Sequence, residues 1–330
     1  MFRWAQNTSR VSQSFFNTNG DAVSVDPGGI FDFTRVSSIP SHFSPVKNLI
    51  SAVDNNRPFY IQRTYALGDM LMGIPAVRAC RTLGLQAHMR VEARHAGIMQ
   101  RLEVPYITTN ERTDMPGIIL DWVLERDHTD PDLGKLHRTE IYFKALGIPM
   151  PELDWSMDPR RFPDVPVTGK YVVMVGQGSN SRKKLPDMTV DKILRKLVDN
   201  GIKVCYNGEP ELDIAGVEFL RRRLSVPELF SLIFHSQALI TVDSGPLWIA
   251  HFASSPIVAI LGPSHFKQRT VLHPLYPEGV YNIQMNDWLG CRSCTENGIG
   301  CREEYRCLNM NGDRLADEVL LGTKKYMSEV

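Results

Sequence analysis

The sequence predicts an α/β protein made of two domains, each built on a parallel β-sheet. A chain of 330 residues is too long for one ordinary hydrophobic core and suits two. Continuous apolar strands alternate with segments of helical period, a pattern typical of parallel sheets covered by helices on both faces. A stretch with five prolines among residues 148–169 separates the two halves and is typical of a linker.

We therefore expect three parts. Residues 1–57 are rich in Ser, Asn, Asp and Pro and show no sustained period, which predicts an irregular N-terminal arm that either packs through its aromatic residues or is disordered. Residues 58–165 are expected to form an N-terminal Rossmann-like domain, and residues 166–330 a C-terminal one. Ligands of such sheets bind beyond the carboxyl ends of the strands, so the two domains are expected to face each other across a cleft.

The elements of the N-terminal domain follow from periodicity. Phe59–Thr64 is apolar and predicts a strand, and Asp69 then opens a helix with one apolar side. Residues 86–104 repeat the strand–helix pattern. The apolar run 115–124 predicts a further strand, and residues 137–148 an amphipathic helix.

The C-terminal half is more regular. Its predicted strands are 170–176, 202–208, 238–243 and 256–261, and its predicted helices are 188–201, 226–237 and 312–329. Four such strands with intervening helices predict a parallel sheet.

Composition narrows the function. Lys plus Arg and Asp plus Glu both number 37, so no global field attracts the chain to nucleic acid or anionic lipid. No apolar run approaches the ~20 residues that span a bilayer. The first 21 residues lack the apolar core and cleavage site of a secretory signal, which favours the cytoplasm.

The stretch Thr241–Pro263 contains an unusual turn. Asp243, Ser244, Gly245 and Pro246 stand where an apolar strand passes into a helix, and Leu247 follows. Free backbone N–H groups and the positive end of the helix dipole at such a place suit a phosphate. A simple Asp or Ser N-cap explains the residues equally well.

Two further turns follow strands. Gly178 and Ser179 precede the cations Lys183 and Lys184. Small residues let the backbone approach an anion, so this loop could bind a phosphate. The alternative is a basic loop that is only solvated. Asp69, after Gly68, begins a helix and offers a carboxylate as a general base, or is only an N-cap.

In this order, these three stretches resemble glycosyltransferase family 9, which includes the heptosyltransferases of the lipopolysaccharide inner core. The Asp-Ser-Gly-Pro block is the most specific part of the resemblance. The turn at residues 208–211 also looks like a turn of that family, and the resemblance implies that Glu211 reaches the donor ribose.

The resemblance implies the GT-B architecture of two facing Rossmann-like domains. It also implies an inverting glycosyltransferase that takes a hexose, heptose or pentose from a nucleotide-diphospho-sugar without a catalytic metal. Asp69 would deprotonate the acceptor hydroxyl of a saccharide, a protein or a modified nucleobase. The donor diphosphate would be held by Gly178, Ser179, Lys183 or Lys184, and the backbone from Asp243 to Leu247, including Ser244, Gly245 and Pro246. Two features depart from the family pattern: Trp248 replaces a usual histidine, and the first domain is short, which disfavours lipopolysaccharide as acceptor.

Four cysteines lie close together near the C-terminus. Cys291, Cys294, Cys301 and Cys307 could form one tetrahedral Zn or Fe site that braces a long loop. Without an export signal, clustered thiols favour a metal over disulfides, although four reduced thiols are the alternative.

Two other functions share these features. A sugar-nucleotide epimerase uses the same scaffold, but the several acids and histidine it needs are not obvious. The third possibility is a non-catalytic sugar-nucleotide-binding protein with the cysteine loop as a metal-braced docking module, and the presence of both Gly68-Asp69 and the Asp243–Pro246 block argues against it.

Overall fold

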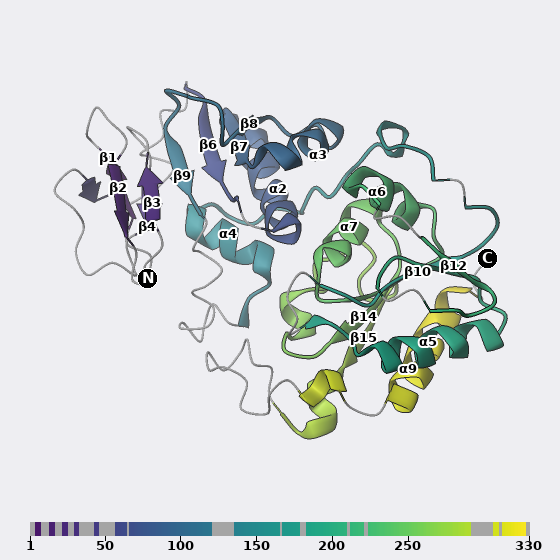
Figure 1. Ribbon diagram of the computed structural model, residues 1–330. Helices are drawn as coiled ribbons and strands as arrows, with labels where there is room; N and C mark the ends of the chain where they lie inside the picture. The colour runs from purple at the N-terminus through teal and green to yellow at the C-terminus, as the bar shows by residue number, and fades with distance from the viewer. Residues whose placement is uncertain are drawn as a thin grey trace. The chain divides into compact units, whose positions relative to one another are not determined.

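The fold is described from a computed structural model (Figure 1). It describes residues 57–64, 66–120, 135–165, 167–178, 183–209, 212–220, 224–291, 306–309 and 312–327, and the backbone of five short strands within the first 45 residues. The chain divides into two compact units. Unit 1 comprises residues 1–126 and 138–154, and unit 2 comprises residues 127–137 and 155–330.

Unit 1 contains a seven-stranded sheet. Its strand order is β5-β1-β4-β9-β6-β7-β8, with β5 Phe43–Pro45, β1 Trp4–Asn7, β4 Ile30–Asp32, β9 Gly117–Ile119, β6 Phe59–Gln62, β7 Ala87–Val91 and β8 Tyr106–Thr108. The strands from β4 to β8 pair in parallel, and β1 is antiparallel to both β4 and β5. The strands β2 Gln13–Phe16 and β3 Ala22–Val25 form a separate antiparallel pair.

The expectation of an irregular arm over residues 1–57 is therefore wrong for these five strands. Three of them extend the sheet that begins the N-terminal domain, so the boundary expected at residue 58 lies inside one unit. The strands are only three or four residues long, which is too short to produce a period that sequence alone reveals.

The helices of unit 1 are α2 Leu67–Thr82, α3 Ala96–Arg101 and α4 Arg138–Leu146, with a short 3₁₀ turn at Ala93–His95. Every residue of α2 from Met70 to Val77 is buried, which is more than two full turns, so the helix is buried on all sides and the prediction of a single apolar side is wrong. The helix begins two residues before Asp69, so Asp69 lies in its first turn and is not its N-cap.

Unit 2 contains a six-stranded sheet in which every neighbouring pair is parallel. The order is β12-β11-β10-β13-β14-β15, with β10 Val172–Val175, β11 Val204–Tyr206, β12 Val217–Phe219, β13 Leu239–Val242, β14 Ile257–Leu261 and β15 Val280–Gln284. Numbered along the chain, these strands have the order 3-2-1-4-5-6 of dinucleotide-binding folds.

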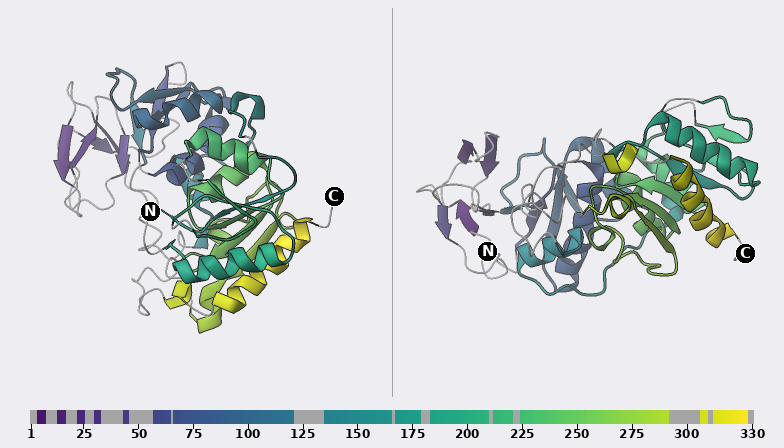
Figure 2. Two further views of the ribbon diagram at one scale, coloured as in Figure 1. Left: turned by 45° about the vertical axis from the view of Figure 1, so that its right-hand side comes forward. Right: turned by 90° about the horizontal axis from the view of Figure 1, so that it is seen from below.

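Helices cover both faces of this sheet, as Figures 1 and 2 show. Helices α5 Asp187–Asp199 and α9 Gly312–Met327 lie side by side on one face, and α6 Val226–Phe234 and α7 Gly245–Ala253 cover the other. Short 3₁₀ turns lie at Pro159–Arg161, Phe266–Gln268, Met285–Leu289 and Arg306–Asn309. Every side chain of β10, β13 and β14 is buried, which is why these strands are continuously apolar in sequence.

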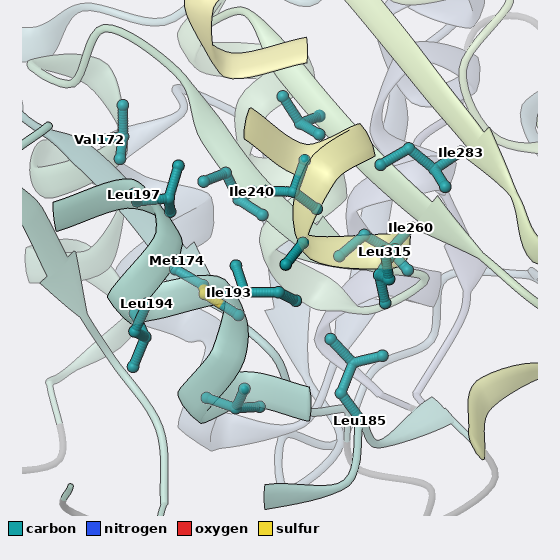
Figure 3. Packing of buried hydrophobic residues seen from close by; sticks show 14 of the residues in the cluster. Val172, Met174, Leu185, Ile193, Leu194, Leu197, Ile240, Ile260, Ile283 and Leu315 are labelled. Atoms are coloured by element: carbon teal, nitrogen blue, oxygen red, sulfur yellow. The ribbon is translucent and has the colours of Figure 1, made fainter. Parts of the chain in front are cut away.

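The core beneath α5 and α9 uses alternate residues of the strands. Val172 and Met174 of β10 point toward it, with Ile240 of β13 and Ile260 of β14 beside them (Figure 3). Ile193, Leu194 and Leu197 of α5 and Leu315 of α9 pack against them. Each of these side chains contributes about 1.5–3 kcal/mol to folding by leaving water. This packing confirms the predicted strand–helix alternation of the C-terminal half.

The two units do not divide where the sequence indicated. The boundary lies at Asp154–Trp155, about ten residues before the expected one, and residues 127–137 belong to unit 2. Among the described residues, none of the helices is long and apolar enough to pass through a lipid bilayer.

Candidate functional site

The strand order of unit 2 marks one place on its sheet for a ligand. Strands β10 and β13 are neighbours, yet the chain leaves them toward opposite faces of the sheet, through α5 and α7. A crevice opens at such a switch point because the two following loops diverge, and ligands of open α/β sheets bind there. The predicted donor motifs at Gly178 and Asp243 both follow these two strands.

The first turn of α7 presents free backbone donors. Ser244 is the N-cap residue with an extended backbone, and Pro246 occupies the first turn. The Ser244 hydroxyl does not cap the helix; its Oγ lies 3.2 Å from Oγ1 of Thr241. No hydrogen bond within the described part of the chain uses the amides of Ser244 or Gly245. These two N–H groups, at the positive end of the helix, remain available to an anion.

The Leu247 amide, which was expected to help hold the diphosphate, is already hydrogen-bonded. Its N–H donates to the carbonyl of Ser244 at 3.2 Å inside the first turn, so its amide is already used. Pro246 has no N–H at all. The backbone donors in the predicted set therefore reduce to Ser244 and Gly245.

Asp243 is an ionic centre rather than a helix cap. Its side chain is 6% exposed and forms ion pairs with Nζ of Lys183 and Nε of Arg269, both at 2.8 Å. The Ser264 hydroxyl also donates to it. Burial alone would raise the pKa of Asp243, but Arg269 and Lys183 outweigh burial and hold this pKa well below its usual range.

The loop after β10 brings its residues against this centre. A β-carbon placed on Gly178 would lie 3.5 Å from Cβ of Ser244 and 3.4 Å from Cβ of Lys183, so the two loops are in close contact at this glycine. The two candidate lysines point differently: Lys183 reaches Asp243, whereas Nζ of Lys184 lies 3.5 Å from Asp187 in the first turn of α5. This geometry favours Lys183 over Lys184 at the switch point.

The buried side of α7 explains Trp248. The Trp248 ring stacks on His251 with centroids 4.9 Å apart, and His137 contacts it edge-on at 5.6 Å. Trp155 and His273 also pack on His251, at 4.9 and 4.8 Å. Burial holds the pKa of His251 well below its usual range and lowers that of His273 to about 4, so both rings are neutral. Trp248 is therefore part of an aromatic core that anchors α7.

Asp69 in unit 1 forms an ion pair with Arg63. Nη2 of Arg63, at the end of β6, lies 3.3 Å from its Oδ2. Arg63 is 2% exposed and Asp69 28% exposed, so the guanidinium is buried behind a carboxylate that solvent reaches. The Tyr142 hydroxyl of α4 donates to the Asp69 carbonyl at 3.2 Å and fixes the start of α2. Asp69 is thus an oriented, accessible carboxylate.

Two cysteines of the predicted cluster are described. Cys307 is 5% exposed, and a β-carbon built on Gly262 would lie 3.1 Å from its Sγ. Cys291 is half-buried and accepts from the side chain of Asn286 through its carbonyl, at 2.8 Å. Among the described residues, no three Cys, His, Asp or Glu side chains form a metal-binding group. Cys294 and Cys301, like Ser179 and Glu211 of the donor set, lie outside the described residues.

Sequence reasoning missed Arg63, Ser264 and Arg269. Arg63 stands six positions before Asp69. Its only local sign of a functional role was that it is a basic residue at the end of a predicted strand. Arg269 is 26 positions beyond Asp243, and only the pairing of β13 with β14 brings it near.

No protein-family model matches the chain, and a search of curated proteins finds no similar sequence. Solved structures with a similar fold do exist. The iron-containing dodecameric glycosyltransferase TibC from enterotoxigenic E. coli aligns with 99% of this chain and 92% of its own, with a TM-score of 0.64 and 16% identity.

Two heptosyltransferases are also similar. The E. coli ADP-heptose lps heptosyltransferase II aligns over 82% of this chain and all of its own, with a TM-score of 0.53 and 15% identity. E. coli heptosyltransferase WaaC with ADP aligns over 69% of this chain and 93% of its own, with a TM-score of 0.51 and 16% identity. The chain therefore has the α/β, GT-B type fold of the heptosyltransferases of glycosyltransferase family 9, and the predicted resemblance to that family is confirmed at the level of the fold.

Proposed function

We propose that the chain is an inverting glycosyltransferase that moves a sugar from a nucleotide-diphospho-sugar to an acceptor hydroxyl. The observation that carries the proposal is the switch point of unit 2. There the amides of Ser244 and Gly245, which no hydrogen bond among the described residues uses, adjoin Asp243, whose carboxylate binds the ammonium of Lys183. Gly178 lies close to both loops. A diphosphate needs donors and positive charge in this compact arrangement.

These groups act on the leaving group. As the bond between the anomeric carbon and the diphosphate oxygen breaks, its electron pair passes to the diphosphate. The fixed N–H donors and Lys183 stabilise this charge without having to reorient. In an inverting transfer the acceptor oxygen forms its new bond on the opposite side of the same carbon.

Asp69 is proposed as the base of this step. It takes the proton of the acceptor hydroxyl as the new glycosidic bond forms. Arg63 orients the carboxylate through Oδ2, which leaves Oδ1 for the acceptor. The chemistry assigned to these residues needs no metal, so we expect EDTA to leave the rate of transfer unchanged.

ADP-heptose is the first donor to test, because TibC is described in complex with ADP-D-β-D-heptose and WaaC with ADP. Thermal-shift measurements with ADP-, GDP- and UDP-sugars identify the donor, since a ligand of the folded state raises Tm. Matched nucleoside monophosphates are the controls. The proposal fails if no nucleotide-diphospho-sugar raises Tm more than its monophosphate does.

Transfer itself is measured by mass spectrometry with saccharide, protein and nucleobase acceptors. Incubation of the donor alone separates the alternatives: an isomerised sugar would indicate an epimerase, and binding without any turnover would indicate a binding protein.

We further propose that Cys291 and Cys307 contribute to a structural Fe or Zn site. Cysteine thiolates suit both metals, and the two sulfurs described flank the segment that holds the other two cysteines. TibC is described as iron-containing. Metal analysis of the purified protein and of Cys291→Ser tests this: about one equivalent is expected in the former and less in the latter, and no metal in freshly purified protein would contradict it.

A further inference from the structure

Two cations share one buried carboxylate at the switch point. Asp243 pairs through Oδ2 with Lys183 and through Oδ1 with Arg269, each at 2.8 Å. Arg269 follows the 3₁₀ turn Phe266–Gln268 after β14, so it comes from a different loop than Lys183 and contacts the other carboxylate oxygen. Ser264 donates to the same Oδ2. The carboxylate is thereby fully engaged from both sides.

The two cations differ in their access to solvent. The Arg269 side chain is 4% exposed and that of Asp243 is 6% exposed, whereas Lys183 is 33% exposed. A diphosphate at the start of α7 can therefore be reached by Lys183, while Arg269 lies behind the carboxylate.

The net charge of this group of side chains depends on Arg269. Lys183 and Asp243 alone would add to zero, and the carboxylate would repel a diphosphate that lies near it. With Arg269 included, the three groups carry a net charge of +1. A buried charge acts through a medium less polarisable than water, so its influence on a nearby anion is strong.

We propose that Arg269 is a positioning residue that neutralises Asp243, so that the charge of Lys183 acts on the donor diphosphate. The inference rests on the proposed function, because it assumes that a diphosphate binds at this switch point. Asp243 pairs with both cations and does not contact the ligand.

The test uses ADP as the probe and isothermal titration calorimetry on the full chain at low ionic strength. Arg269→Gln removes the charge and keeps a hydrogen-bonding side chain; we expect its affinity for ADP to fall about tenfold or more, the effect of one unit charge near a doubly charged group. Arg269→Lys keeps the charge and should stay within about threefold of the wild type.

The double variant Asp243→Asn/Arg269→Gln separates charge from structure. It removes one charge of each sign, which returns the site to +1, so the affinity for ADP should recover to within about threefold of the wild type. The Tm of each variant is measured beside its affinity, because a role confined to folding would lower Tm and leave the affinity of the folded protein for ADP unchanged. If Arg269→Gln does not fold, the double variant still tests the proposal, because its net charge at the site equals that of the wild type.

The outcomes are distinct. A wild-type affinity for ADP in Arg269→Gln, or no recovery in a folded double variant, would overturn the role of Arg269 and leave the proposed function standing. A wild-type protein that binds neither ADP nor any other nucleoside diphosphate would overturn both.

Discussion

Replacement of Asp243 by Asn is expected to destabilise unit 2 strongly. The substitution keeps the size of the side chain and removes its negative charge. Arg269, which is 4% exposed, then remains in the interior with no charged partner in its place. Removing one partner of a buried ion pair costs about 3–5 kcal/mol, because the other charge is left uncompensated.

Urea unfolding measures this loss as a change in the free energy of unfolding. For a folding unit of 150–250 residues, each kcal/mol shifts Tm by about 2–4 °C, so Tm should fall by about 10 °C. Asp187→Asn is the matched control, because Asp187 pairs with Lys184 at 3.5 Å while both side chains are about half exposed. An exposed pair contributes less than about 1 kcal/mol. Equal effects of the two substitutions would refute the reasoning.

The same carboxylate predicts a pH dependence. The pKa of Asp243 in the folded protein is lowered, so its stabilising contribution is complete above the unfolded-state pKa of about 3.9 and is lost as pH falls toward the folded-state value. The difference in unfolding free energy between wild type and Asp243→Asn should be constant above about pH 5 and shrink below about pH 4. A difference that does not change between pH 7 and pH 3 would contradict this assignment.

Three further substitutions test other parts of the account. Asp69→Asn should lower the rate of sugar transfer about 10²–10⁴-fold with an unchanged affinity for ADP, since only the base is lost; an active variant would exclude Asp69 as the base. Lys183→Ala should weaken ADP binding about tenfold or more, as expected for a charged hydrogen bond, and Lys184→Ala much less; the reverse order would reassign the lysine. Gly262→Ala should destabilise the fold by about 1–3 kcal/mol in urea unfolding, because its β-carbon would approach a side chain of the Arg306–Asn309 turn to 2.8 Å; unchanged stability would show that this turn yields easily.

The second half of the fold was predictable because its signal is local. The strands at 172–175, 239–242 and 257–261 are apolar at every position, since helices cover both faces of their sheet. Helix α5 follows the predicted period closely and ends before Gly201, whose φ of 76° suits glycine. The turn after β13 carried a local signal as well, because Asp, Ser, Gly and Pro together mark a helix start, although the residues alone fitted an N-cap and a phosphate site equally well.

The remaining features depend on contacts that are distant in sequence. Among the strands of the first 45 residues, β4 pairs with β9 far along the chain, while the other described pairs of these strands lie within this segment. Each of these strands has only three or four residues, which is too short to show a period. His137 was assigned to the N-terminal domain and packs instead on Trp248. The choice between Lys183 and Lys184 likewise needed coordinates, because adjacent residues with the same charge differ only in where they point.

A crystal structure of the protein with ADP tests the central claim most directly. We predict that the diphosphate lies at the carboxyl ends of β10 and β13, within hydrogen-bonding distance of the Gly245 amide and of Nζ of Lys183, while Arg269 remains paired with Asp243. ADP bound elsewhere on the chain, with the first turn of α7 in contact with water alone, would contradict it.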